Sequence, residues 1–321
     1  MKTVKKHHGI VVPMVTPFTA EGELDEGAAR RIIDFLLQGG VDGIFILGTT
    51  GEKASIPVSM RRKLIRLAVE HVNCRALVYA GISDDCLSHS LEAAEESFRL
   101  GVDAVAAHPP CYYSLQPDEL LDYFITLANN LSGPLLLYNI PSTTHVSIPV
   151  EVIARLSQQP NVVGLKDSEN REGRPEEVVR YVGGREGFSL FIGTAALAAQ
   201  AFSLGMDGVV PSSANLVPHL WRQVYTSAKA SDWEAVEQSQ SRVNRVASVF
   251  QRNRTLGQSL AALKAAMSTL GLCSPHMLPP LRSLTEAQIE IVQQDLNSLE
   301  TGENGVPIRA LDKQAFSRKM R

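Results

Sequence analysis

The chain has 321 residues, of which 44% are hydrophobic and 20% are charged. This composition is that of a folded globular protein and excludes general disorder. The 31 Lys and Arg residues and the 34 Asp and Glu residues give a formal net charge of −3. Such a balance offers no general attraction to nucleic acid or to anionic membranes, so we expect neither as a partner.

The cysteine pattern and the N-terminal segment indicate where the protein works. The cysteines show neither C-x-x-C pairing nor metal-ligand spacing, which favours a reducing compartment; they are Cys74, Cys86, Cys111 and Cys273. Pro13 and Pro17 interrupt the first apolar run, and no small-residue cleavage pattern follows it. No stretch approaches the roughly 18 apolar residues of a membrane span. We therefore expect a cytoplasmic protein.

Short apolar runs alternate with longer amphipathic segments along about two thirds of the chain, which is typical of βα units. Between the runs, as in residues 26–40 and 59–72, apolar residues recur at helical spacing. Near-continuous apolar strands indicate burial on both faces, as in a parallel sheet covered by helices. There are eight such runs, beginning at Gly9, Gly43, Ala76, Ala104, Pro134, Val162, Phe188 and Gly208.

Eight consecutive βα units can close into a (β/α)8 TIM barrel of about 230 residues. An open, doubly wound sheet is the alternative, but the segment after the first strand has no G-x-G-x-x-G turn. We therefore predict an α/β fold with a barrel over residues 1–230. A C-terminal helical extension is predicted over residues 231–300, and a mobile tail over residues 301–321.

In such barrels the active site lies at the carboxyl ends of the strands. The polar residues expected there show no metal-ligand spacing and no phosphate-binding loop, so we predict no metal and no cofactor. They are Thr49, Thr50, Glu52, His108, Tyr112, Tyr138, Asn139, Lys166, Asp167, Gly193, Thr194, Ser212 and Ser213.

Lys166 ends an apolar run that begins at Val162. A lysine amine in a desolvated strand-end site can attack a carbonyl and form a Schiff base. The alternatives are an amine that reaches solvent or one that pairs with Asp167. Because adjacent strand residues point to opposite sides, Asp167 should face the helices if Lys166 faces the barrel mouth.

Other candidates have structural alternatives of similar weight. Tyr138 could relay a proton, or it could simply fill the barrel. The Gly48–Glu52 turn, GTTGE, offers amides and two hydroxyls to a carboxylate, but Thr49 or Thr50 could instead cap the next helix. We interpret His108 as structural or solvated.

Four motifs in chain order resemble the dihydrodipicolinate synthase and N-acetylneuraminate lyase family. They are GTTGE (Gly48–Glu52), P-x-Y-Y (Pro110–Tyr113), Y-N-x-P (Tyr138–Pro141) and G-x-K-D (Gly164–Asp167). The resemblance covers roughly residues 8–300. It implies a (β/α)8 class I aldolase, a lyase, that binds pyruvate or another 2-oxo acid as a Schiff base. It also implies a homotetramer, a dimer of dimers.

The resemblance further implies a role for each matching residue. Lys166 matches the Schiff-base lysine and Tyr138 the proton-shuttling tyrosine. Thr49 and Thr50 match the pair that binds the substrate carboxylate, Thr49 also acting in proton relay, and Tyr112 matches a tyrosine that reaches a neighbouring subunit's site. The remaining substrate-binding positions are then Thr143, Gly193, Val210 and Ser212.

Two departures from the family patterns narrow the substrate. Thr143 stands where dihydrodipicolinate synthases carry an arginine, and a neutral side chain cannot clamp a second carboxylate. Gly193 and Thr194 stand where sialic acid lyases carry acidic residues. The pocket is then uncharged apart from His145, which suits a hydroxylated 2-oxo acid such as a 2-keto-3-deoxy sugar acid or a hydroxy-oxoglutarate.

Several alternatives remain open at this point. They are dihydrodipicolinate synthase proper, a 2-keto-3-deoxy acid dehydratase using the same imine, and a silent module that binds 2-oxo acids without turnover. A metal- or phosphate-dependent barrel enzyme is a further alternative, without support from any motif.

Overall fold

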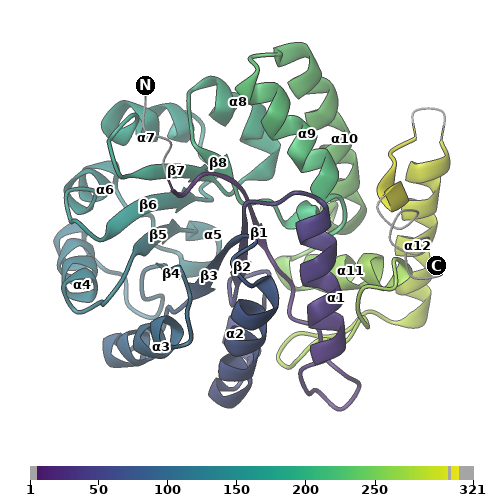
Figure 1. Ribbon diagram of the computed structural model, residues 1–321, viewed down its shortest axis with the longest axis horizontal. Coiled ribbons are helices and arrows are strands. Elements are labelled where there is room, and N and C mark those ends of the chain that lie inside the picture. The colour runs from purple at the N-terminus through teal and green to yellow at the C-terminus, as the bar shows by residue number, and fades with distance from the viewer. Residues whose placement is uncertain (1–5, 303–304, 311–321) are drawn as a thin grey trace. The chain divides into compact units, whose positions relative to one another are not determined.

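The computed structural model describes residues 6–302 and 305–310 (Figure 1). Its strands lie in the eight predicted runs and follow one another in chain order around a closed barrel. The first strand pairs with the eighth, and the third to eighth strands pair in succession, all in parallel. The predicted TIM-barrel fold is therefore confirmed. The strands are β1 (Gly9–Pro13), β2 (Gly43–Ile46), β3 (Leu77–Gly81), β4 (Ala104–Ala107), β5 (Leu135–Asn139), β6 (Val162–Asp167), β7 (Ser189–Ile192) and β8 (Gly208–Val209).

Helices separate the strands, and each amphipathic one buries its apolar face; α1, for example, buries Ile32, Ile33 and Leu36. The α-helices up to the end of the barrel are α1 (Glu26–Gln38), α2 (Val58–Val72), α3 (Leu87–Arg99), α4 (Pro117–Asn129), α5 (Pro141–Thr144), α6 (Val150–Leu156), α7 (Arg174–Val182), α8 (Ala198–Ser203) and α9 (Pro218–Lys229). Short 3₁₀ helices are η1 (Lys53–Ser55), η2 (Ala195–Leu197) and η3 (Ser212–Asn215).

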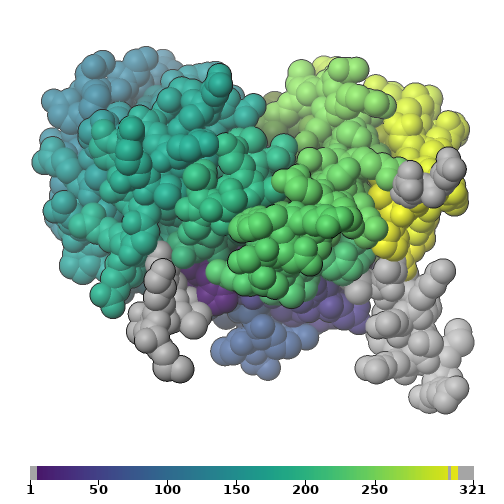
Figure 2. Space-filling view, turned by 90° about the horizontal axis from the view of Figure 1, so that it is seen from above, coloured from purple at the N-terminus to yellow at the C-terminus, as the bar shows by residue number. Residues whose placement is uncertain are grey.

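The C-terminal part is helical, as predicted. It comprises α10 (Trp233–Gln251), α11 (Leu256–Thr269), α12 (Glu286–Thr301) and the short η4 (Ile308–Ala310). The α10, α11 and α12 helices pack on one another, and in Figure 2 their green to yellow segments adjoin. Most of the predicted mobile tail lies outside the described residues, because residues 303–304 and 311–321 are not described.

The helical run after the last strand is broken into α9 and α10 by a short turn. Ser231 adopts φ 57°, and the Asp232 carboxylate accepts a hydrogen bond from the Ala235 amide at 3.1 Å. A side-chain oxygen at this position satisfies an amide that has no partner in the first helical turn, so Asp232 begins a new helix.

The chain forms two compact units. In the part of the chain that the structure describes, the first contains residues 6–11 and Leu77–Pro211, and the second contains Val12–Ala76 and the residues from Ser212 to Ala310. Strands β3 to β8 therefore belong to the first unit, and β2 and the C-terminal helices belong to the second. Among the described residues, none of the helices combines the length and apolar character needed to cross a bilayer.

Candidate active site

Two candidate residues meet at the carboxyl ends of β5 and β6 in the first unit. The strand register places Tyr138 opposite Lys166, and both residues are 4% exposed. The Lys166 Nζ atom lies 3.8 Å from the centroid of the Tyr138 ring. The His108 ring approaches the same tyrosine edge-on, with 6.2 Å between ring centroids. The structure thus brings a buried amine, a phenol and an imidazole together.

The next residue on each strand points the other way and joins a buried polar cluster of Asn139, Asp167 and Arg174. Asn139 Nδ2 donates to the two Asp167 carboxylate oxygens at 3.2 and 3.3 Å. Arg174, the first residue of α7, donates from Nε to Asp167 Oδ2 at 2.9 Å. Burial raises the pKa of Asp167, and the guanidinium of Arg174 opposes that rise.

This cluster also anchors the loop of residues 140–148, which contains α5. Asn139 Oδ1 accepts a hydrogen bond from the Ile148 amide at 3.0 Å, and Arg174 donates to the Ile148 carbonyl at 2.9 Å. Glu169 accepts from Asn139 and from the Ser147 hydroxyl. Burial opposes ionisation of Glu169, but hydrogen bonds from Ser147, Asn139 and Arg171, together with the positive charge of Arg174, lower its pKa.

Thr143, the predicted specificity residue, lies within this loop. Its side chain is half-buried, and its hydroxyl donates to the Ile140 carbonyl at 3.2 Å. The neighbouring Thr144 is buried, and its hydroxyl donates to backbone carbonyls of the same loop. His145 is exposed and adopts φ 58°. Only His145 among these three residues carries a side chain that can be positively charged.

The predicted substrate-binding positions Gly193 and Val210 follow β7 and β8. The Gly193 amide donates to the Asp167 carbonyl at 2.6 Å, and a Cβ added at Gly193 would lie 1.9 Å from Ser168 Oγ. No side chain fits at position 193 without displacing Ser168. Val210 is 3% exposed, and its amide donates to the Ile192 carbonyl at 2.9 Å.

The Gly48–Glu52 turn follows β2 in the second unit. Thr50 is buried and Thr49 is half-buried. The Thr16 hydroxyl donates to the Gly51 carbonyl at 2.7 Å, and the Glu52 amide donates to the Thr49 carbonyl at 3.1 Å. The next helix, η1, has Glu52 at its N-cap and no side-chain cap, and α2 begins only at Val58, also without one, so neither threonine caps a helix. The helix-capping alternative is therefore wrong.

Ser212 opens η3 in the same unit, and its hydroxyl accepts a hydrogen bond from Gln251 Nε2 at 3.4 Å. The residue that orders this segment is Asn215, which sequence reasoning missed. Asn215 Nδ2 donates to the Pro13 and Ser212 carbonyls, and its Oδ1 accepts from the Val15 amide. An asparagine in an otherwise apolar stretch, Ala214 to Val217, was the available signal.

Tyr112 lies in the loop between β4 and α4 and is 79% exposed. It packs edge-on against Tyr113, which is 69% exposed, with 5.1 Å between ring centroids. Asp85 anchors the loop, because its carboxylate accepts hydrogen bonds from the backbone amides of Cys111 and Tyr112 at 2.7 and 3.3 Å. These hydrogen bonds lower the pKa of Asp85. Asp85 was not among the site residues predicted from the sequence.

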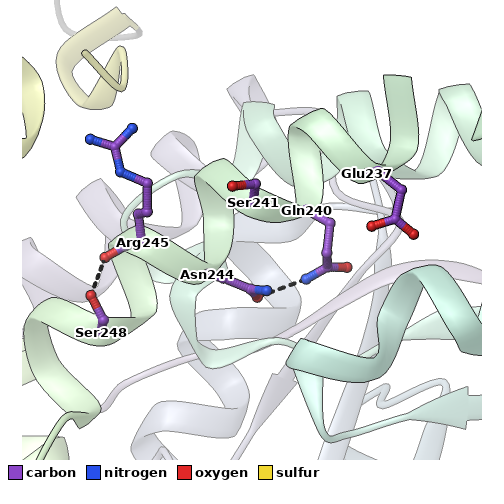
Figure 3. A pocket seen from close by; sticks show the side chains of 6 residues that line it. All are labelled: Glu237, Gln240, Ser241, Asn244, Arg245 and Ser248. Atoms are coloured by element: carbon purple, nitrogen blue, oxygen red, sulfur yellow. Dashed lines mark hydrogen bonds between the residues drawn. The ribbon is translucent and has the colours of Figure 1, made fainter. Parts of the chain in front are cut away.

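A shallow groove of about 410 Å³ runs along α10 (Figure 3). Its six lining residues form one polar face of that helix and include none of the predicted site residues: Glu237, Gln240, Ser241, Asn244, Arg245 and Ser248. Gln240 donates to Asn244 at 2.8 Å along this face. Within residues 6–302 and 305–310, no group of three or more His, Cys, Asp or Glu side chains is placed to hold a metal ion.

Comparisons with known proteins agree with the fold and with the motifs. A 4-hydroxy-tetrahydrodipicolinate synthase of Thiobacillus denitrificans is 31% identical over 300 residues, which are 94% of this chain and 99% of the relative. A protein of Escherichia coli (strain K12) named "Probable 2-dehydro-3-deoxy-D-pentonate aldolase" is 29% identical over 286 residues, 88% of this chain and 94% of the relative.

Among solved structures, dihydrodipicolinate synthase from Bacteroides thetaiotaomicron matches with a TM-score of 0.87 and 32% identity, covering 91% of this chain and 98% of that one. A prophage protein from Escherichia coli K12, solved in complex with pyruvate, matches with a TM-score of 0.85 and 25% identity, covering 91% and 98%. The model of the dihydrodipicolinate synthetase family matches residues 6–299. The protein is thus a lyase of the aldolase type, and the chain belongs to the dihydrodipicolinate synthetase family.

Proposed function

We propose that the enzyme forms a Schiff base between Lys166 and pyruvate or a related 2-oxo acid, and that its full substrate is a hydroxylated 2-oxo acid. The observation that carries the proposal is the buried Lys166 amine, 3.8 Å from the centroid of the Tyr138 ring at the ends of adjacent strands. An amine held at a strand end and largely shielded from water is placed to attack a carbonyl bound beside it.

The proposed chemistry starts with attack of the Lys166 amine on the C2 carbonyl, which loses water to give an imine. The protonated imine accepts the electron pair of the C3–C4 bond as that bond breaks. Tyr138 gives its phenolic proton to the water that leaves as the imine forms, and the resulting phenolate takes the proton of the C4 hydroxyl, so that an aldehyde leaves and an enamine remains. Protonation of the enamine at C3 and hydrolysis of the imine then release pyruvate and free Lys166.

We assign the substrate carboxylate to Thr49 and Thr50, with Thr49 also relaying the proton. The support is the GTTGE motif and the finding that neither hydroxyl caps α2. Donors fixed on the carboxylate would stop the bound substrate from rotating. Thr143, Gly193, Val210 and Ser212 are proposed to line the remainder of the substrate-binding surface.

The choice of a hydroxylated substrate, a 2-keto-3-deoxy sugar acid or a hydroxy-oxoglutarate, rests on Thr143. Its neutral hydroxyl can share a hydrogen bond with a substrate hydroxyl, whereas it cannot pair with a second carboxylate. The Escherichia coli relative named as a pentonate aldolase supports the same substrate class. Dihydrodipicolinate synthesis is the second candidate, favoured by the name of the Thiobacillus denitrificans relative.

Borohydride trapping tests the imine. Pyruvate with borohydride should add a stable mass to the wild-type chain, mapped by peptide mass spectrometry to Lys166. Lys166→Ala should lose the adduct and nearly all turnover while keeping its circular dichroism spectrum and melting temperature. Wild-type protein that stays unlabelled at saturating pyruvate would refute the proposal.

A substrate panel separates the remaining alternatives. Hydroxylated 2-oxo acids that yield free pyruvate and an aldehyde identify cleavage, and loss of water without free pyruvate identifies a dehydratase. Aspartate semialdehyde consumed with pyruvate identifies the synthase. Imine formation with no product from any member of the panel would leave only a silent binding module.

We also propose that the protein assembles as a homotetramer in which Tyr112 reaches a neighbouring subunit. The support is the family match, together with two adjacent aromatic side chains that the single chain leaves largely exposed. Sedimentation velocity should give a tetramer, and Tyr112→Ala should lower turnover in the tetramer. A monomer with full activity would refute this role.

A further inference from the structure

A buried ion pair joins the Gly48–Glu52 turn to the C-terminal helices. Lys264, on α11, places its Nζ atom 2.5 Å from Glu52 Oε1, and the two side chains are 1% and 0% exposed. The same amine donates to the His276 carbonyl at 2.9 Å and lies 4.0 Å from the centroid of the Phe18 ring. All four residues belong to the second unit.

Burying both charges of the pair costs free energy, so a contribution to stability is a weak explanation for its presence. Burial raises the pKa of Glu52 and lowers the pKa of Lys264, while the attraction between the two charges opposes both shifts. Transferring two charges from water can cost as much as their attraction returns, and neutral side chains of similar volume often stabilise a fold equally well. A requirement for one definite local conformation would explain the pair better.

Such a requirement is visible in the backbone of the turn. Glu52 adopts φ 57°, a left-handed conformation that is unfavourable for a glutamate. Its amide closes the turn by donating to the Thr49 carbonyl. The residue before Glu52 is also fixed, because the Gly51 carbonyl accepts a hydrogen bond from the Thr16 hydroxyl. A Cβ at Gly51 would lie 3.0 Å from the Met14 carbonyl oxygen. The two threonines therefore lie in a segment fixed at its glycine and at its glutamate.

We propose that Lys264 is a positioning residue for substrate binding: by pairing with Glu52 it holds the left-handed end of the turn, and so fixes Thr49 and Thr50 for a 2-oxo acid carboxylate. The inference rests on the proposed carboxylate role of these threonines. It gives α11, a helix outside the eight βα units, a part in substrate affinity. Lys264 touches neither the substrate nor Lys166 in this role.

The test compares stability with pyruvate affinity in neutral replacements of the pair. Lys264→Met leaves a buried, unpaired carboxylate and should lower the free energy of unfolding. The double variant Glu52→Gln/Lys264→Met removes both charges and should regain most of that loss. If the pair positions the turn, the pyruvate concentration that half-saturates borohydride trapping should remain raised about tenfold in the double variant, with a maximal extent of trapping close to wild type.

A second double variant, Glu52→Asn/Lys264→Met, makes the test specific to conformation. Asparagine tolerates the left-handed region better than glutamine. The half-saturating pyruvate concentration of the Asn variant should therefore lie closer to the wild-type value than that of the Gln variant. Lys229→Met, which removes an exposed lysine of α9, is the matched control and should change neither readout.

Each outcome decides a different question. A double variant that regains stability and binds pyruvate like wild type would overturn the positioning role and leave the imine at Lys166 intact. Equal affinities in the Gln and Asn variants would overturn the conformational explanation. Absence of any adduct in the wild-type enzyme would instead refute the proposed function, and the inference with it.

Discussion

At the scale of single residues, the residue that follows each of Lys166 and Tyr138 in its strand is buried on the opposite side of that strand. Asp167 and Asn139 are 2% and 0% exposed, and Arg174 supplies the compensating positive charge. The cluster holds both strands in register immediately behind the two candidate catalytic groups. A substitution in this cluster should therefore lower the free energy of unfolding directly, and should lower turnover only through the strands that carry Lys166 and Tyr138.

Arg174→Met tests the charge balance of this cluster. It leaves the Asp167 carboxylate buried without its cation, so the free energy of unfolding should fall by about 3–5 kcal/mol in chemical denaturation. The added change Asp167→Asn removes the unpaired charge and should regain part of that loss. Arg171→Met is the matched control, because the Arg171 side chain is 50% exposed; a loss as large as that of Arg174→Met would contradict the argument.

Gly193→Ala tests the close approach beside the candidate site. The added Cβ would meet Ser168 Oγ at 1.9 Å and the Asp167 carbonyl at 3.2 Å, so the Ser168 side chain must move and the backbone at Asp167, next to Lys166, is crowded. We expect a loss of about 1–3 kcal/mol in stability and a clear loss of turnover, partly rescued by Ser168→Gly. Gly27→Ala in α1, where the nearest atom lies 3.4 Å away, should be neutral or slightly stabilising.

At the scale of elements, the strands were predictable because buried parallel strands are nearly continuous in apolar residues. The break between α9 and α10 depends on the backbone at Ser231 and on the capping carboxylate of Asp232, and not on the apolar periodicity. Helix α5 spans only Pro141–Thr144 and is too short for a periodic pattern. Short elements are set by local turn chemistry and escape patterns of hydrophobicity.

In the candidate site, too, some contacts could be predicted from the sequence and others could not. Lys166 and Tyr138 could be paired from the sequence, because each ends a predicted strand and consecutive strands are neighbours in a barrel. The ion pair of Glu52 with Lys264 and the contacts of Asn215 with Pro13 could not, because they join residues about 200 positions apart. No spacing rule along the chain encodes such contacts; they exist only once the helices are packed.

Asn215→Leu tests the link between η3 and the segment that follows β1. The leucine has a similar volume but leaves the Val15 amide and the Pro13 carbonyl without their partner. Each buried group left unpaired should cost about 1–3 kcal/mol, measured by chemical denaturation. Asn130→Leu, at an exposed position with a single hydrogen bond to Thr126, should cost much less; equal losses would show that the buried contacts carry little stability.

At the scale of the whole molecule, stability should depend on pH through His7. Burial, with a smaller contribution from Lys6, lowers the pKa of His7 from 6.5 to about 4, while its Nδ1 atom lies 2.8 Å from the buried Tyr79 hydroxyl. Between these pKa values the unfolded chain binds a proton that the folded chain does not. Folding is therefore favoured fully above about pH 6.5 and progressively less as the pH falls toward 4.

The expected size of this effect is about 3 kcal/mol, from the difference between the two pKa values. Urea unfolding at pH 7 and at pH 4.5 should show the loss in wild-type protein. His7→Gln keeps a polar side chain that does not titrate, and should flatten the pH dependence. The exposed His89→Gln is the control, and a profile for His7→Gln as steep as that of wild type would contradict the assignment.

The anchoring of residues 140–148 also bears on how such an enzyme can diversify. The loop is tied at Ile148 to Asn139 and Arg174, which belong to the same cluster that backs Lys166 and Tyr138. Thr143 and His145 lie between the ties and contribute no side-chain contact to them. Substitutions at these two positions should therefore leave the register of Tyr138 and Lys166 unchanged, so this part of the loop can vary independently of the two candidate catalytic groups.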